Sequence, residues 1–183
     1  MNGAMAESLR GRLLAATPAL ADTNFSHAVV YLLDHTDEGA LGVVLNRPSD
    51  IEVSEALPQW DVLAARPGVV FVGGPVQPEA VVALGQAAEE SEQLQPVGDG
   101  VGIVDLRTDP LSLIGRVAGL RLFAGYAGWG AGQLEAEIAE GGWFVVDAAS
   151  QDVFADRPDE LWLEVLTRQG GLFRTISDDP TLN

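Results

Sequence analysis

Two almost continuously apolar segments, residues 28–34 (AVVYLLD) and 40–46 (ALGVVLN), constrain the fold of this chain more than any other feature. Each has the length and the Val/Leu content of a β-strand, and a short polar link at 36–39 (TDEG) lies between them. So short a connection predicts an antiparallel hairpin. Because neither strand alternates apolar with polar residues, we expect other elements to cover both faces of this hairpin.

Further elements follow from the spacing of apolar residues and from Gly and Pro at the breaks. We expect strands at 12–17, 69–72, 80–85, 101–106, 120–124 and 143–148. We expect helices on both sides of Pro58 within 51–65, at 110–117, after residue 132 to about residue 140, and at 158–170. Asp109 is the expected cap of the helix at 110–117 and Asp156 that of the last helix, which is expected to end at Gly170. The strand at 80–85 is expected to pair with 69–72 as a hairpin, and the acidic segment 86–100 to form an exposed loop.

The glycine-rich segment 125–132 (GYAGWGAG) is expected to be a loop that leads from the strand 120–124 into a helix. A strand, loop, helix and further strand in this order predict a crossover connection. Hairpins combined with a crossover indicate an α/β fold of the mixed (α+β) kind, in which helices flank a mixed β-sheet. We expect one domain over residues 9–176, with a disordered N-terminal tail at 1–8 and a C-terminal tail at 177–183.

The charge of the chain excludes several classes of partner. Its 183 residues include 10 Arg, no Lys and 27 Asp or Glu, which gives a net charge of −17. Nucleic-acid-binding proteins present a basic stripe to the phosphates, and no cluster of Arg is present here. The same charge opposes binding to anionic membranes. We therefore expect no direct nucleic-acid partner and no membrane partner, and we interpret the charge as a source of solubility.

The residue types that bind metals or form disulfides are scarce. The chain has no Cys, which excludes disulfides and thiolate sites, and its two histidines, His27 and His35, would lie about 25 Å apart on one strand. We therefore expect no metal site and no cofactor. The first residues lack the apolar core of a signal peptide, and no segment has the roughly 18 apolar residues of a membrane helix, so the expected location is cytoplasmic.

Three segments at predicted strand ends form the candidate ligand-binding site. Its residues are Asn46, Arg47, Gly73, Gly74, Gly128, Trp129, Gly130 and Gln133. Arg47 would bind a carboxylate or phosphate, the amides of Gly73 and Gly74 would line an anion nest, and Trp129 would form a lid or partner anchor. The structural alternatives stay open: an ion pair for Arg47, a hairpin turn for the glycines, and packing on the sheet for Trp129.

Four separated segments resemble one family of bacterial proteins. They are 11–25 (GRLLAATPAL and DTNF), 39–48 (GALGVVLNRP), 71–76 (FVGGPV) and 121–143 (RLFAGYAGWGAGQLEAEI and GGW). In this order they are similar to the AlgH/YqgE family from about residue 9 to 162, with small departures at Ala131 and Thr23, where Pro is expected. The resemblance implies an AlgH-like fold in which a mixed, partly rolled β-sheet is flanked by helices, and a cytosolic bacterial protein. It implies no reaction and no catalytic residues.

Three hypotheses about function follow. The leading one is a non-enzymatic binding module for a small anionic ligand or a protein partner, which uses the three segments around Arg47, Gly73 and Trp129. The second is a hydrolase-type enzyme in which His35 or Glu135 acts as general base beside Arg47 or Asn46. The third is a transcriptional regulator, because one branch of the resembling family bears that name. The net charge of −17 and the lack of a readable helix-turn-helix disfavour the third hypothesis.

Overall fold

The computed structural model describes residues 7–20, 22, 25–88, 94–98 and 100–169. The C-terminal tail expected at 177–183, the expected helix end at Gly170 and most of the N-terminal tail lie outside these residues. Within the described part, no helix is both long enough and apolar enough to cross a membrane.

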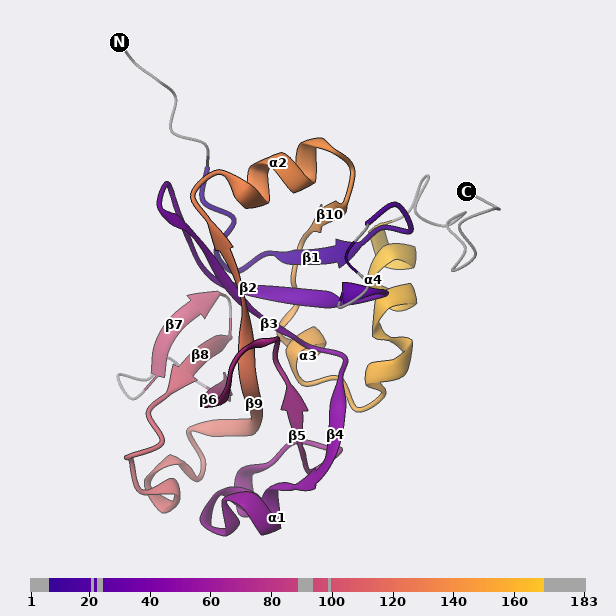
Figure 1. Cartoon of the computed structure of the whole chain (residues 1–183). Helices are drawn as coiled ribbons and strands as arrows, with labels where there is room; N and C mark the ends of the chain where they lie inside the picture. The colour runs from indigo at the N-terminus through magenta and orange to yellow at the C-terminus, as the bar shows by residue number, and fades with distance from the viewer. Residues whose placement is uncertain (1–6, 21, 23–24, 89–93, 99, 170–183) are drawn as a thin grey trace.

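One mixed β-sheet of ten strands dominates the described part of the chain (Figure 1). Its strands are β1 (Leu13–Ala16), β2 (Val29–Thr36), β3 (Gly39–Val44), β4 (Pro48–Glu52), β5 (Val69–Val72), β6 (Val76–Ala87), β7 (Leu94–Gly98), β8 (Val101–Val104), β9 (Val117–Gly130) and β10 (Trp143–Val146). The strand order is β10-β1-β2-β3-β9-β6-β8-β7, and β4 reaches the sheet through β5, which pairs with β9. Of the ladders between these strands, only β5–β9 is parallel. The sheet is partly rolled and flanked by helices, as expected.

The 14-residue strand β9 joins the two halves of the sheet. Its C-terminal end pairs with β3, where Leu41 lies opposite Gly128, and its earlier part pairs with β6, where Val82 lies opposite Phe123. Phe123 belongs to the central core, whereas Trp129 belongs to a second core on the other side of the sheet. Residues 119–123 of β9 are buried without alternation because both faces are covered there, whereas Gly128 and Gly130 near its end are exposed.

Short helices cover the faces of the sheet. They are α1 (Val53–Ala56), α2 (Gln133–Ala139), α3 (Ser150–Val153), α4 (Leu161–Gln169) and the 3₁₀ helices η2 (Pro58–Leu63), η3 (Pro110–Leu113) and η4 (Pro158–Glu160). The central core takes in α3 and α4 through Val153, Leu161 and Val165. Leu134 of α2 caps the second core, and Trp60 of η2 with Leu113 of η3 fills the third.

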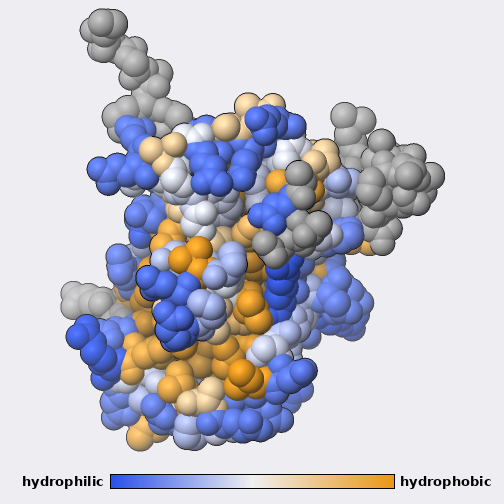
Figure 2. Space-filling model, viewed as in Figure 1, coloured by the Kyte–Doolittle hydropathy of each residue, from blue (hydrophilic) through white to orange (hydrophobic). Residues whose placement is uncertain are grey.

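The surface is not uniformly polar. Hydrophobic residues gather over the lower half of the face shown in Figure 2, whereas the upper part is mostly hydrophilic. Exposed large apolar side chains include Ile51 on β4 and Val72 on β5, strands that lie in this lower half in Figure 1.

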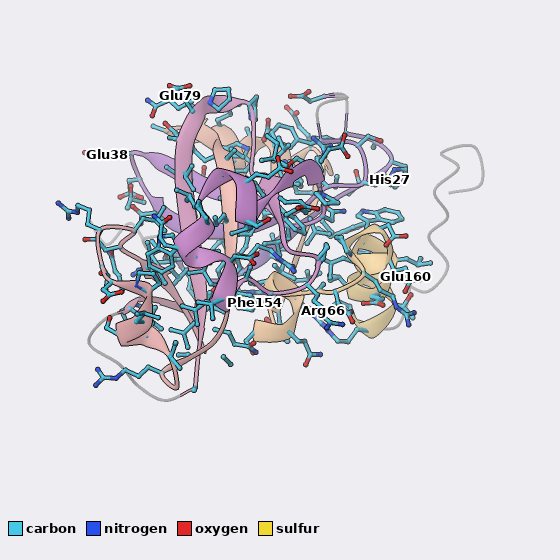
Figure 3. The ribbon with its side chains drawn as sticks, turned by 90° about the horizontal axis from the view of Figure 1, so that it is seen from below. His27, Glu38, Arg66, Glu79, Phe154 and Glu160 are labelled. Carbon is cyan, nitrogen blue, oxygen red and sulfur yellow. The ribbon has the colours of Figure 1, made fainter. Side chains whose placement is uncertain are left out.

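The buried cation Arg121 ties β9 to two loops. Its Nη1 donates to the carbonyl oxygens of Val153 (3.2 Å) and Ala155 (2.9 Å), and its Nη2 donates to the carbonyl oxygen of Arg66. Figure 3 shows Arg66 and Phe154 on the same side of the molecule, where these two loops approach each other. The guanidinium also lies 4.4 Å from the ring centroid of Phe71, a cation–π contact.

Several of the sequence predictions are confirmed. β2 and β3 form the expected antiparallel hairpin. The described pairings make β10 parallel to β9, with β3, β2 and β1 between them, so α2 lies in the expected crossover. Asp109 is the expected cap and accepts from the amide of Leu111 at 3.0 Å, although its helix is the short η3 instead of a helix over 110–117.

Other predictions are wrong. β6 does not pair with β5; it pairs with β8 and β9, because the turn at Gly73 and Gly74 carries the chain across β9. The segment 125–132 is not a loop, since β9 continues to Gly130 with Gly residues paired in the ladder. The segment 86–100 contains β7, whose Pro96 fits an edge strand. β4 was not expected, and Arg157, not Asp156, precedes the first turn at η4.

Candidate functional site

The glycines of the turn after β5 pack tightly against β9. The amide of Gly73 donates to the carbonyl oxygen of Ala124 (2.8 Å), and its carbonyl oxygen accepts from the amide of Val44 (2.8 Å). A Cβ atom on Gly73 would overlap the carbonyl of Gly125, and one on Gly74 would overlap the backbone of Tyr126. The absence of side chains here therefore permits close packing of three backbones, and the amide of Gly73 already has a partner.

Asn46 and Arg47 close the start of β2. The side chain of Asn46 accepts from the amide of Val29 (3.0 Å) and donates to the carbonyl oxygen of His27 (2.8 Å). Arg47 donates to the carbonyl oxygen of Ser26 at 3.4 Å. Desolvation by partial burial lowers the pKa of Arg47, and the charge of Asp22 opposes this shift. The pair therefore supports the loop before β2, and the guanidinium of Arg47 keeps part of its surface in solvent.

Trp129 packs on the sheet, the second of its two alternatives. Its side chain lies in the second core, and the residue is 7% exposed. Its Nε1 donates to Oε2 of Glu137 at 2.6 Å, and its ring stacks on Phe25. Nearby, Oε1 of Gln133 accepts from the amide of Gly130 (3.0 Å), so Gln133 links the end of β9 to α2.

The structure thus brings the backbones of all three expected segments together, since the carbonyl oxygen of Arg47 accepts from the amide of Val72 at 2.7 Å. Gly73 and Gly74 contact β9 at Gly125 and Tyr126, but the indole of Trp129 and the guanidinium of Arg47 have separate partners. The ligand-binding role of the eight candidate residues stays a prediction, and it competes with the internal contacts that they already make.

His35 and Glu135, the candidate general bases, pair with each other. The amide of Leu9 donates to Nδ1 of His35 (2.9 Å), so Nδ1 carries no proton, and Nε2 donates to Oε1 of Glu135 (2.6 Å). Both ring nitrogens are therefore occupied, and the ring is buried. The hydrogen bond from His35 lowers the pKa of Glu135. This geometry joins α2 to β2, and Arg47 and Asn46 lie at the other end of the hairpin.

A polar cavity of about 390 Å³ opens elsewhere, where the two ends of the rolled sheet approach each other. Its lining comes from the chain just before β1, from β2, β7 and β8, and from the segment that leads from β10 to the first residue of α3. The lining residues are Arg10, Gly11, Arg12, Tyr31, Gly98, Val101, Asp147, Ala148, Ala149 and Ser150. We call this cavity the seam pocket.

Two arginines border the seam pocket. Arg10 donates from Nε to the carbonyl oxygen of Leu33 (3.1 Å) and from Nη2 to that of Pro96 (2.6 Å), so it bridges β2 and the edge strand β7. Arg12 pairs through Nη2 with Oδ1 of Asp147 at 3.2 Å. Each guanidinium thus has a fixed position and, within the described residues, Arg10 has no carboxylate partner.

Two glycines let the ends of the sheet meet at this pocket. Gly11 has φ +79°, a conformation that favours glycine, and a Cβ there would lie 3.1 Å from the carbonyl oxygen of Val97. A Cβ on Gly98 would lie 2.7 Å from the hydroxyl oxygen of Tyr31. The close approach of these backbones positions the Tyr31 side chain, which is almost fully buried, at the floor of the pocket.

This pocket was not recognisable from the sequence because its parts are distant in the chain. A signal was nevertheless present: Arg10 and Arg12 flank Gly11 just before the first strand, in a chain with only 10 Arg. Their convergence with Asp147 and Ser150 depends on the pairing of β1 with β10, which no local pattern specifies. Among the described residues, no group of three or more Asp, Glu or His side chains is arranged to hold a metal ion.

The comparisons with known proteins agree on one family. The family model described as AlgH-like matches residues 13–174. The chain is 51% identical to a UPF0301 protein of Streptomyces coelicolor and 46% identical to one of Thermobifida fusca, with 96% of both chains covered in each case.

Two solved structures have the same fold. The crystal structure of a protein from Corynebacterium diphtheriae matches with a TM-score of 0.87 and 32% identity, over 92% of this chain and 91% of that one. The solution structure of the AlgH protein from Pseudomonas aeruginosa matches with a TM-score of 0.69 and 31% identity, over 93% and 94%. Sequence and fold together show that this chain belongs to the AlgH-like family.

Proposed function

We propose that the protein is a non-enzymatic binding module for a small anionic ligand, and that the ligand binds in the seam pocket beside Arg10 and Arg12. The observation that carries this proposal is the presence of two arginines in the lining of one cavity of about 390 Å³, in a chain whose net charge is −17. The acidic surface of the protein repels anions, whereas the two arginines give the seam pocket a locally more positive potential.

The chemistry of the lining supports binding in preference to catalysis. Guanidinium groups donate charge-assisted hydrogen bonds to carboxylates and phosphates, and Ser150 adds a hydroxyl group. Among the lining residues, all of which the structure describes, there is no His or Glu, and the one carboxylate, Asp147, pairs with Arg12. A general base or an activated nucleophile therefore has no evident candidate in the seam pocket.

The volume of the pocket supports a small ligand. Small-molecule sites usually measure about 300–1,000 Å³, and the seam pocket lies at the lower end of this range. Rigid elements position its walls, because Arg10 is anchored on two strands and Asp147 directly follows β10. A site with a fixed shape pays little conformational entropy when the ligand enters.

Titration with small anions tests the proposal. Benzoate, citrate and inorganic phosphate are added at low ionic strength to the wild-type protein and to R12A, and binding to both is followed by calorimetry. In the wild type, NMR of the Arg12 Nε–H group reports whether this side chain takes part. We expect R12A to weaken binding by roughly tenfold or more, because a hydrogen bond to a charged group is lost. The matched control is R107A, which also removes one positive charge and one Asp–Arg pair, but far from the pocket lining. Failure of all three anions to bind would refute the proposal.

A further inference from the structure

We infer that the ligand of the seam pocket is an organic carboxylate, and that Asp147 is a built-in competitor which this carboxylate displaces from Arg12. The inference rests on the proposed function and goes further, because it names the ligand class and a residue that limits affinity. It depends on one ion pair inside the pocket, between Nη2 of Arg12 and Oδ1 of Asp147 at 3.2 Å.

The Asp147 side chain is free to leave its position. It is 84% exposed, and the Arg12 side chain is 39% exposed, so water solvates both groups when they separate. Exposed ion pairs of this kind contribute little to stability, because water competes for both charges. To bind Arg12, an anion therefore has to displace only the weakly held carboxylate of Asp147 and does not have to break a buried ion pair.

The backbone beneath Asp147 is fixed independently of its side chain. Its carbonyl oxygen accepts from Nη2 of Arg168 at 3.2 Å. Arg168 is in turn held by two hydrogen bonds to Asp152, at 2.7 and 2.8 Å, and Asp152 is 4% exposed. The carboxylate of Asp147 can therefore rotate into solvent while the wall of the seam pocket keeps its shape.

The internal competitor also indicates the chemical class of the ligand. In the free protein Arg12 holds a carboxylate, so its position already suits that group. Once Asp147 has moved away, Arg10 and Arg12 present two positive charges to the ligand. The remaining lining includes Tyr31, Val101 and Ala148, which suit a carbon skeleton better than water. A cavity of about 390 Å³ also exceeds what a single inorganic anion fills.

The test compares D147N with D105N. Both substitutions remove one negative charge and one exposed Asp–Arg ion pair, at 3.2 and 2.8 Å respectively, but only Asp147 lines the seam pocket. Benzoate, as the organic carboxylate, and inorganic phosphate are titrated into the wild type and both variants. We expect D147N to bind benzoate about two- to fivefold more tightly than the wild type, because the competing ion pair is lost. D105N should match the wild type.

The outcomes separate the two proposals. If benzoate binds the wild type and R12A weakens it, but D147N binds no more tightly, the binding module stands and the competitor role of Asp147 is wrong. If phosphate binds and benzoate does not, the carboxylate class is wrong. If benzoate, phosphate and citrate all fail to bind the wild type, the proposed function itself fails. The variant D147A, which cannot form even a neutral hydrogen bond to Arg12, should repeat the gain seen in D147N.

Discussion

The indole nitrogen of Trp129 lies 2.6 Å from Oε2 of Glu137, and this one oxygen also accepts from the indole of Trp143 at 3.2 Å. The two rings pack edge to face with centroids 6.0 Å apart. A single carboxylate on α2 thus pairs two buried N–H groups that come from β9 and β10. The spacing of Trp129 and Glu137 along the chain is explained by this contact without any ligand.

Removal of this carboxylate should destabilise the protein. In E137A both indole donors lose their partner while they stay buried, and we expect a loss of about 2–4 kcal/mol in the free energy of unfolding. E137Q keeps an acceptor and should lose less. Urea unfolding followed by tryptophan fluorescence measures the stability of both variants. The control is E140A, because Glu140 is exposed. Equal stabilities of E137A and E140A would contradict this account.

The sequence sufficed for those parts of the fold that local patterns determine. The hairpin of β2 and β3 follows from two apolar segments and a short link, and Asp109 is recognisable as a cap from the Pro that follows it. The pairing of β6 with β9 was not predictable in this way, because β5 and β6 are neighbours in sequence and their hairpin is equally compatible with the local pattern.

The glycine-rich segment shows why the candidate site was harder to predict than the fold. Glycines before a helix are typical of anion-binding loops and also of close strand packing. Which of these two roles the glycines have depends on the elements that pack beside them. Here Gly128 and Gly130 lie opposite Leu41 and Gly39 of β3, so they belong to paired strands. The seam pocket needs the meeting of β1, β7 and β10, which is a property of the whole sheet.

The turn after β5 provides a sharp test of the packing argument. G73A and G74A would each force a Cβ into the backbone of β9, so we expect each to cost about 2 kcal/mol or more, or to prevent folding. G68A is the matched control, since nothing lies within 4 Å of its added Cβ. Chemical denaturation measures all three. A G68A variant as unstable as G73A would show that these losses do not come from steric overlap.

The pair of His35 and Glu135 predicts a dependence of stability on pH. The hydrogen bond from His35 lowers the pKa of Glu135 below its ordinary value of 4.5. A carboxyl group whose pKa is lower in the folded state stabilises the protein above its unfolded-state pKa, and this contribution is lost as the pH falls through the folded-state value. The wild type should therefore exceed E135Q in Tm at about pH 7, and the gap should close below about pH 4.

The control for this titration is E140Q, at the opposite end of α2 and without a described partner for its side chain. Its Tm should follow the wild type across the whole pH range. Melting curves recorded at intervals of about one pH unit would suffice. A gap between the wild type and E135Q that stays constant down to low pH would contradict a role for the ionised carboxylate.

Arg121 should be among the least replaceable residues of the chain. Burial lowers its pKa to about 10, although Asp156 opposes the shift, so it stays charged near neutral pH. Three carbonyl oxygens from two loops accept from it. R121M fills much of the same volume but leaves these carbonyls unpaired, and we expect a loss of about 3 kcal/mol or more in the free energy of unfolding. R157A, at an exposed arginine near α4, should lose less than about 0.5 kcal/mol.

Hydrogen exchange can distinguish a local effect of R121M on the two loops from a general loss of stability. If the guanidinium organises the loops, amides around α3 and η4 should exchange faster in R121M, while those of β2 and β3 should keep their protection in proportion to the global stability. The reason is that the contacts of Arg121 reach Val153 and Ala155 but not the hairpin. Uniformly faster exchange at all amides would instead show that Arg121 contributes only to the stability of the whole core.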